Sequence, residues 1–192
     1  ENLFICTNFS EECEGNITVG NPQTCTIENV LVEQKIIGNN VYIVWSNDDN
    51  GQVNIFFSAS TDNGQTFSTP IDVRRNIAFS FDPYILVSGN NVYIAWSGES
   101  GGDLGVFFSV STDNGQTFST PIDVINNDGR SITPIQLIVS ENNIYIVWTD
   151  TSNGGDFDVF FSASTGNGQT FSTPIDVSSD TGFSYFGQMI VQ

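Results

Sequence analysis

The chain has 192 residues, of which 22 are acidic and 4 are basic, and it carries no histidine, so its net charge at pH 7 is −18. Nucleic acids and anionic membranes require a basic surface, so this charge argues against both as partners. No apolar run approaches the roughly 18 residues of a membrane-spanning helix. The missing histidine excludes catalysis by Ser-His-Asp or Cys-His groups.

The first 25 residues hold three cysteines and two sequons for N-glycosylation. The cysteines are Cys6, Cys13 and Cys25, and the sequons begin at Asn8 and Asn16. Cysteines beside sequons favour an oxidising compartment, so we expect an extracellular or cell-surface glycoprotein with a disulfide among these cysteines. Because the number of cysteines is odd, one thiol stays free or pairs with another chain.

Three segments of the chain repeat one pattern, which indicates a repeat architecture. Their tryptophans, Trp45, Trp96 and Trp148, lie 51 and 52 residues apart. In the first unit, Val41–Trp45 and Ile55–Ala59 are rich in β-branched and aromatic residues, which indicates strands rather than helices. The run Val41–Trp45 is apolar on both faces, so we expect it to be sandwiched between two sheets.

Two further short runs complete each unit. One of them, Tyr84–Val87 in the second unit, comes before a tight Asn- and Gly-rich turn and the tryptophan run. The other is a Pro-Ile-Asp-Val run whose proline (Pro70, Pro121 or Pro174) has no N–H and suits the edge of a sheet. Four antiparallel strands per unit are typical of a propeller blade. We therefore predict one all-β, propeller-like domain of residues 1–192, with blades at residues 31–73, 78–124 and 133–177.

The two ends of the chain read as parts of one further blade. Residues 183–192 align with Phe79–Ser88, the first strand of a blade, whereas residues 1–7 align with Asn90–Trp96, the second strand. We therefore predict about four blades, the fourth shared between a degenerate, cysteine-bearing part at residues 1–30 and the C-terminal strand. That strand either closes a ring within the chain or is donated to a neighbouring molecule.

The turn between the Phe-Phe run and the Pro-Ile-Asp-Val run resembles the Asp-box, the S-x-D-x-G-x-x-aromatic turn of bacterial-neuraminidase-type repeats. The matching residues are Ser60, Asp62, Gly64 and Phe67, then Ser111, Asp113, Gly115 and Phe118, then Ser164, Gly168 and Phe171, with Gly166 in place of the third aspartate. The serine and aspartate side chains can bond the backbone of the turn, the glycine permits a left-handed residue, and the ring folds back onto the blade. The resemblance implies a sialidase-like propeller in which the turn is a structural staple. The missing aspartate is expected to loosen the third turn alone.

The same resemblance provides a test for sialidase activity. Sialidases of this family bind the substrate carboxylate with three arginines and use a Tyr–Glu pair and an acidic group for catalysis. Here Arg74 and Arg75 are adjacent, so on an extended strand they point to opposite faces, and Arg130 lies in a polar loop. We therefore expect no sialidase activity and, more broadly, no enzyme.

The loops after the tryptophan strands differ between units and comprise residues 47–51, 98–103 and 150–158. Loops that vary on a constant scaffold commonly carry binding. The third offers Asp150, Asp156 and Asp158 around glycines, which are oxygen ligands of the kind that Ca²⁺ takes, although the loop does not match the EF-hand pattern. A calcium site and a plain polar hairpin without any cofactor are both kept as interpretations.

These observations favour a non-catalytic extracellular protein with a structural or adhesive role, which assembles with copies of itself through its terminal strands. The alternative is a monomeric closed propeller that binds glycan or protein ligands through the variable loops. A sialidase-like glycosidase is the third hypothesis.

Overall fold

The computed structural model describes residues 39–49, 52–75, 77–125, 131–151, 156–178, 182–184 and 187–191. Every regular element within these ranges is a β-strand, and none of the described residues forms a helix long and apolar enough to cross a membrane. The predicted disulfide candidates Cys6, Cys13 and Cys25 and the sequons at Asn8 and Asn16 lie outside the described residues.

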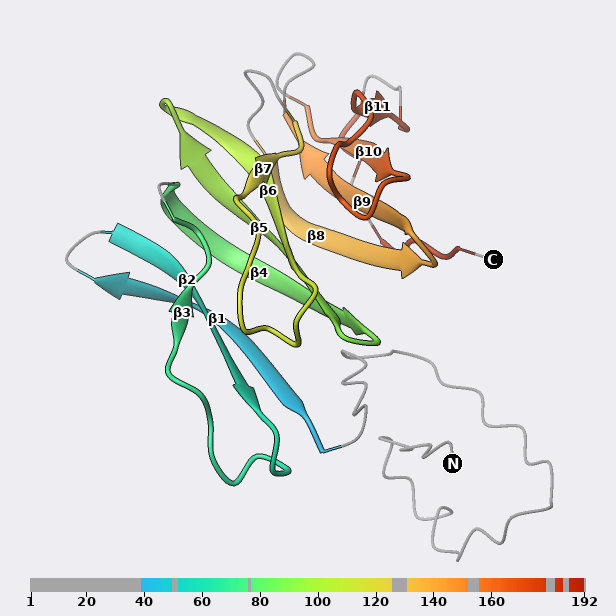
Figure 1. Cartoon of the computed structure of the whole chain (residues 1–192). Helices are drawn as coiled ribbons and strands as arrows, with labels where there is room; N and C mark the ends of the chain where they lie inside the picture. Colours follow the sequence, from blue (N-terminus) through green and yellow to red (C-terminus); the bar gives the residue numbers. More distant parts are fainter. Residues whose placement is uncertain are drawn as a thin grey trace, which may run out of the picture. The chain divides into compact units, whose positions relative to one another are not determined.

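The strands form three antiparallel sheets, in each of which neighbouring strands follow one another along the chain (Figure 1). Sheet 1 consists of β1 (Val41–Asp49), β2 (Gln52–Ser60) and β3 (Ile71–Asp72). Sheet 2 consists of β4 (Ala78–Ser88), β5 (Asn91–Ser100), β6 (Asp103–Ser111) and β7 (Ile122–Asp123). Sheet 3 consists of β8 (Ser131–Ser140), β9 (Asn143–Asp150), β10 (Asp158–Ser164) and β11 (Ile175–Asp176).

Sheet 2 lies between sheets 1 and 3, and each of its faces forms half of a hydrophobic core. Side chains of β5 alternate between the two faces, as in any strand. Val92, Ile94 and Trp96 belong to the core shared with sheet 1, whereas Tyr93 and Ala95 belong to the core shared with sheet 3. All five are buried. A strand that is apolar on both faces is thus sandwiched between sheets in the second unit.

Strand β1 differs from β5, although their sequences are similar. Ile43 of β1 is 42% exposed, whereas its counterpart Ile94 is fully buried. Within the described residues, the expected sandwich around Val41–Trp45 is therefore formed on one face only.

The three prolines were predicted to mark strands at the edges of sheets, and the structure confirms this. Strands β3, β7 and β11 lie at sheet edges and come directly after Pro70, Pro121 and Pro174. Proline has no N–H to donate to a further strand, so these positions tolerate it.

The described C-terminal residues, 183–184 and 187–191, lie in no strand, in contrast to the prediction of a completing strand at residues 183–192. Instead, the Ser184 N–H donates to the Phe157 carbonyl oxygen of the same chain at 2.6 Å. A strand needs a ladder of backbone bonds to a partner strand, and the partner was predicted in residues outside the described ranges. The number of blades and the closure of a ring stay predictions.

Candidate functional site

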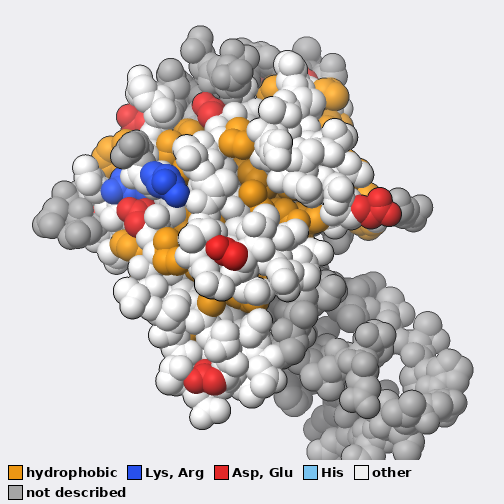
Figure 2. Space-filling view, in the orientation of Figure 1, with side chains coloured by type: hydrophobic (Ala, Val, Ile, Leu, Met, Phe, Trp, Pro, Cys, Tyr) orange, Lys and Arg blue, Asp and Glu red, His pale blue; other side chains and the backbone are white. Residues whose placement is uncertain are grey.

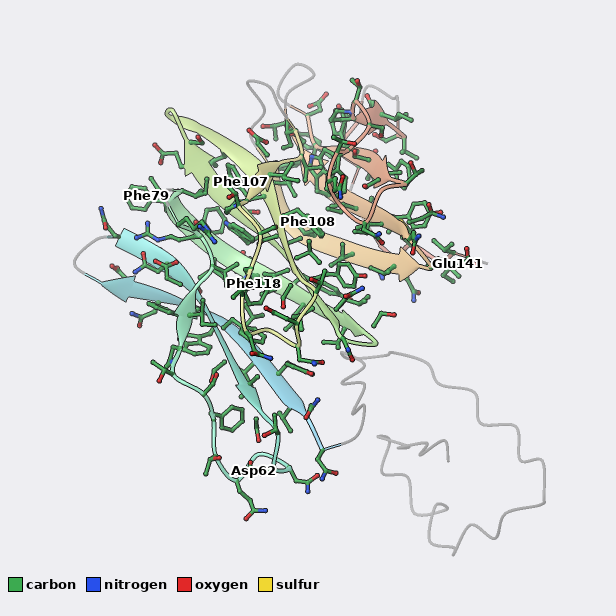
Figure 3. The ribbon with its side chains drawn as sticks, viewed as in Figure 1. Asp62, Phe79, Phe107, Phe108, Phe118 and Glu141 are labelled. Atoms are coloured by element: carbon green, nitrogen blue, oxygen red, sulfur yellow. The ribbon has the colours of Figure 1, made fainter. Side chains whose placement is uncertain are left out.

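The turn that follows β2 is closed by its own side chains. Ser60 Oγ donates to Asp62 Oδ1 at 2.7 Å and accepts from the Gly64 N–H at 2.8 Å. The Asp62 carboxylate accepts from the Thr66 N–H and hydroxyl at 2.9 and 2.6 Å, and Figure 3 shows Asp62 at the tip of this turn. The turn after β6 has the same bonds between the same residue types. We refer to residues 60–67, 111–118 and 164–171 as the Asp-box-like turns.

The hydrogen bonds lower the pKa of Asp62 and of Asp113 from an ordinary 3.8 to about 2. The largest cause is the Thr66 hydroxyl at Asp62 and the Ser111 hydroxyl at Asp113. Because the folded pKa lies below the unfolded one, the stabilisation by these carboxylates is complete above about pH 4 and is lost as the pH falls towards 2.

This pKa shift predicts how Asp113→Asn changes acid unfolding. The variant should be less stable than the wild type at neutral pH, because the charge-assisted bonds are lost. It should also lose less stability between about pH 4 and pH 2, since one titrating group with a lowered pKa is gone. Urea unfolding at a series of pH values measures both effects. Parallel pH profiles for variant and wild type would contradict the assignment.

The third Asp-box-like turn keeps only the serine bonds. Ser164 Oγ accepts from the Gly168 N–H at 3.1 Å and from the Gly166 N–H at 3.4 Å. The corresponding bond to Gly64 in the first turn is shorter, at 2.8 Å. Glycine at position 166 has no carboxylate to accept from Ser164 or Thr170, so this turn lacks the three carboxylate bonds that the other two have.

Gly166→Asp is expected to raise the free energy of unfolding by about 0.5–1.5 kcal/mol, the usual net gain from a hydrogen bond. A Cβ at this position would meet no atom within 4 Å, so the side chain has room to reach Thr170. Gly166→Ala is the matched control, because it makes the same backbone change without adding the carboxylate. Equal stability of the two variants in urea unfolding would show that the third turn does not adopt the aspartate geometry.

The aromatic ring at the end of two of these turns packs against the preceding sheet. The Phe118 ring meets Phe57 of β2 edge to face at a centroid distance of 4.9 Å, and the Phe171 ring meets Phe108 of β6 at 5.1 Å. Figure 3 labels Phe108 and Phe118. At these two turns the ring thus folds back against the neighbouring sheet. The neighbouring sheet offers a buried phenylalanine, and such edge-to-face pairs are favourable.

The glycine of each turn lets the backbone approach that phenylalanine. Gly115 and Gly168 have φ of 83° and 78°, and a Cβ on them would lie 2.4 Å from Phe57 and 2.3 Å from Phe108. Only glycine satisfies both the left-handed backbone and the close approach. Gly64 has a similar φ of 79°, yet a Cβ there would meet one atom only, at 3.8 Å. The second and third turns therefore interlock neighbouring sheets.

A pair of serines joins the segment after each turn to the strand before it. The sequence analysis did not identify these pairs. Ser58 Oγ donates to the Ser68 carbonyl oxygen at 2.8 Å, and the Ala59 N–H donates to Ser68 Oγ at 3.1 Å. The same bonds recur at the pairs Ser109–Ser119 and Ser162–Ser172. The available signal was the repetition of Phe-Phe-Ser and Phe-Ser-Thr-Pro in each unit.

Two of the predicted variable loops consist mainly of strand ends. Asp49 pairs with Gln52 and Ser100 pairs with Asp103, so residues 47–51 and 98–103 are largely strand. The third loop, between β9 and β10, is longer. We call the ends of the strands at these three connections the hairpin edge.

One cross-strand pair at the hairpin edge differs in chemistry between the sheets. The pair begins two residues after the tryptophan of each unit. It consists of Asn47–Asn54 in sheet 1, Gly98–Gly105 in sheet 2 and Asp150–Asp158 in sheet 3. Asp150 and Asp158 are each 2% exposed, and Asp158 Oδ1 accepts from Ser178 Oγ at 3.1 Å. Like charges directly opposite each other in paired strands destabilise a sheet, so this carboxylate pair carries an electrostatic cost that the Asn and Gly pairs do not.

The predicted calcium site includes Asp156, which lies in the described part of the same loop, whereas residues 152–155 do not. Among the described residues, no three acidic, cysteine or histidine side chains gather so as to hold a metal ion. Calcium at Asp150, Asp156 and Asp158 stays a prediction.

Arg74 and Arg75 line the same hollow, although adjacent residues of an extended strand would point to opposite faces. Arg75 has a φ of 55°, so the backbone turns there, and both side chains border a space of about 310 Å³. Arg75 Nη2 donates to the Phe118 carbonyl oxygen at 2.9 Å, and Arg74 Nη1 donates to that of Ile77 at 2.8 Å. Figure 2 shows these basic groups together on the visible face. Both arginines thus donate to backbone carbonyl oxygens. Among the described residues no third arginine lies beside them, and Arg130 is outside the described ranges.

No protein-family model matches the sequence, and no curated protein is significantly similar to it. Solved structures do match. A Hadza microbial sialidase is 15% identical with a TM-score of 0.53, over 69% of this chain and 34% of its own. The GH93 α-L-arabinofuranosidase of Fusarium graminearum is 14% identical with a TM-score of 0.51, over 71% of this chain and 44% of its own. A protein of unknown function from Dyadobacter fermentans is 15% identical with a TM-score of 0.56, over 75% of this chain and 40% of its own.

The chain shares the fold of β-propeller glycosidases. At such identities the likeness concerns the fold alone, and the chain spans less than half the length of each of these three structures.

The prediction that this chain is not an enzyme is contradicted by the comparison. Structures that share its fold include a sialidase and an arabinofuranosidase, which are glycoside hydrolases. The prediction relied on the missing arginine triad of sialidases, and this criterion does not apply to glycosidases that act on other sugars.

Proposed function

We propose that this chain is the Asp-box part of a sialidase-type β-propeller that recognises carbohydrate at its hairpin edge. The observation that carries the proposal is the pair Asp150–Asp158, two buried carboxylates opposite each other in a fold that glycoside hydrolases share. Carboxylates accept hydrogen bonds from sugar hydroxyls. A pair of them at a suitable separation is also the usual machinery of glycoside hydrolysis.

The position of the pair supports this role. Packing explains the glycine pair of sheet 2, because a Cβ on Gly98 would lie 2.8 Å from Ile77 and 3.1 Å from Phe107. The change that bears on binding is the one from Asn47–Asn54 in sheet 1 to Asp150–Asp158 in sheet 3. Sugar contacts need groups that differ around a scaffold, and loops and strand ends on a rigid scaffold are where binding residues concentrate.

A glycan array and fluorogenic glycosides test the proposal together. We expect the folded protein to bind or cleave a sugar of the sialoside or arabinofuranoside class, and Asp150→Asn or Asp158→Asn to weaken this at least about tenfold, the effect of losing about 1.4 kcal/mol. Glu141→Gln is the matched control, because it removes one carboxylate at the exposed β8–β9 turn, at the other end of sheet 3 (Figure 3). A folded wild type that neither binds nor cleaves any sugar would contradict the proposal.

A structural or adhesive role outside the cell is the second candidate. It is favoured by the uncovered apolar side chains at both ends of the array, such as Ile43 and Val177, which are 42% and 59% exposed. An extracellular location and glycosylation at Asn8 and Asn16 are part of this proposal and rest on the cysteines and sequons alone. Mass spectrometry of the natively produced protein would detect glycans on these asparagines.

A further inference from the structure

Sheet 1 presents a face that is covered elsewhere in the array. We call this the front face and define it by Val41, Ile43, Trp45, Phe56 and Phe67. The counterparts of these residues in sheet 2 are Val92, Ile94, Trp96, Phe107 and Phe118, and all of them are buried against sheet 1. On the front face, by contrast, Phe67 is 43% exposed, compared with 7% for Phe118.

Sheet 3 presents the opposite face uncovered. We call this the rear face and define it by Tyr145, Phe161, Ile175 and Val177. Val177 is 59% exposed, whereas its counterparts Val73 of sheet 1 and Val124 of sheet 2 are 1% and 2% exposed. The difference arises because sheets 2 and 3 cover these counterparts, while no described sheet covers Val177.

The two uncovered faces are the halves of an interface that the chain already builds twice. The second turn places its ring on Phe57, and the third places its ring on Phe108. Residues 60–67 have the same sequence as residues 111–118, and Phe161 occupies the position of Phe57 and Phe108 in the repeat. Among the described residues, no such ring pair forms between the first turn and a preceding sheet, or between Phe161 and a following turn.

Neither partner is available within the described chain. No strand of sheet 1 contacts a strand of sheet 3 among the described elements.

We propose that a second copy of this chain stacks its rear face on the front face of the first, head to tail, with Phe67 of one molecule against Phe161 of the next. This differs from strand donation, because the contact is between sheet faces and uses no terminal strand. An interface between two different faces leaves one of each free at the ends of a dimer, so further copies add until a ring closes or a filament grows. The proposal is independent of carbohydrate recognition.

Two charge substitutions at the two faces test this arrangement. Phe67→Asp disables the front face and Val177→Asp disables the rear face, and both positions are exposed enough for the monomer to fold, which near-ultraviolet circular dichroism checks. We expect the wild type to associate with rising concentration in sedimentation velocity at physiological salt. Each variant alone should be monomeric, with a dissociation constant raised about thirtyfold or more, as for an interface hot spot.

An equimolar mixture of the two variants provides the decisive readout. The intact front face of Val177→Asp and the intact rear face of Phe67→Asp should form a dimer with one copy of each variant, and growth should stop there. Ile190→Asp is the matched control in an exposed C-terminal position and should associate as the wild type does. The proposal is overturned if the wild type stays monomeric because other residues cover the faces. It is also overturned if Ile190→Asp blocks association while the face variants do not, since that result indicates strand donation.

Discussion

Replacing Gly115 by alanine is expected to lower the free energy of unfolding by about 2–5 kcal/mol. Part of this, about 1–2 kcal/mol, is the cost of a left-handed backbone at a residue with a Cβ. The rest, about 1–3 kcal/mol, is overpacking, because the new methyl group would lie 2.4 Å from the buried Phe57 ring. Chemical unfolding monitored by tryptophan fluorescence measures the change.

Gly64→Ala is the matched control for this prediction. It changes the same residue in a turn of identical sequence and similar φ, but a Cβ there would meet only one atom, at 3.8 Å. We expect only the backbone cost, about 1–2 kcal/mol. If both alanine variants lose the same stability, the second turn does not press on sheet 1 as described.

Phe108→Ala is expected to destabilise the protein by about 3–5 kcal/mol, the usual cost of emptying a phenylalanine site in a core. Phe108 is fully buried between sheets 2 and 3 and contacts the Phe171 ring. Its repeat counterpart Phe161 stacks on Tyr145 but is only half-buried. Phe161→Ala should therefore cost about 1–2 kcal/mol, because the Phe161 side chain buries less apolar area in the folded chain than Phe108 does.

The comparison of the two phenylalanine variants has to be made where the chain is monomeric, because self-association would bury Phe161. Unfolding at several protein concentrations identifies that range. If Phe161→Ala and Phe108→Ala lower the free energy of unfolding of the monomer equally, the rear face of sheet 3 is covered within the chain.

The strands and their burial could be predicted because both are encoded locally. Every residue of Val92–Trp96 is apolar, which indicates a strand that is buried on both faces, and β5 has that environment. The prolines before β3, β7 and β11 mark sheet edges because a missing N–H is a local property. The side-chain bonds of the Asp-box-like turns also follow from short-range spacing.

The partner of each turn could not be predicted from such patterns. Phe118 and Phe57 are far apart in sequence, and periodicity shows that a ring is buried without showing which sheet buries it. The shared hollow of Arg74 and Arg75 depends on the positive φ of Arg75, which no residue preference signals for arginine. The sequence predicts Asp150 and Asp158 as calcium ligands, but only the strand register shows that they pair with each other, at the position that Asn47–Asn54 and Gly98–Gly105 occupy in the other sheets.

A double-mutant cycle between Phe57 and Phe118 tests most directly the central claim that these turns lock each sheet to the one before it. With leucine substitutions, we predict a coupling energy of about 0.5–1.5 kcal/mol between the two rings. The parallel cycle between Phe57 and Phe67, the ring of the turn in the same sheet, should be additive within about 0.3–0.5 kcal/mol. Coupling of Phe57 to Phe67 but not to Phe118 would contradict the claim and would show that each turn staples its own sheet.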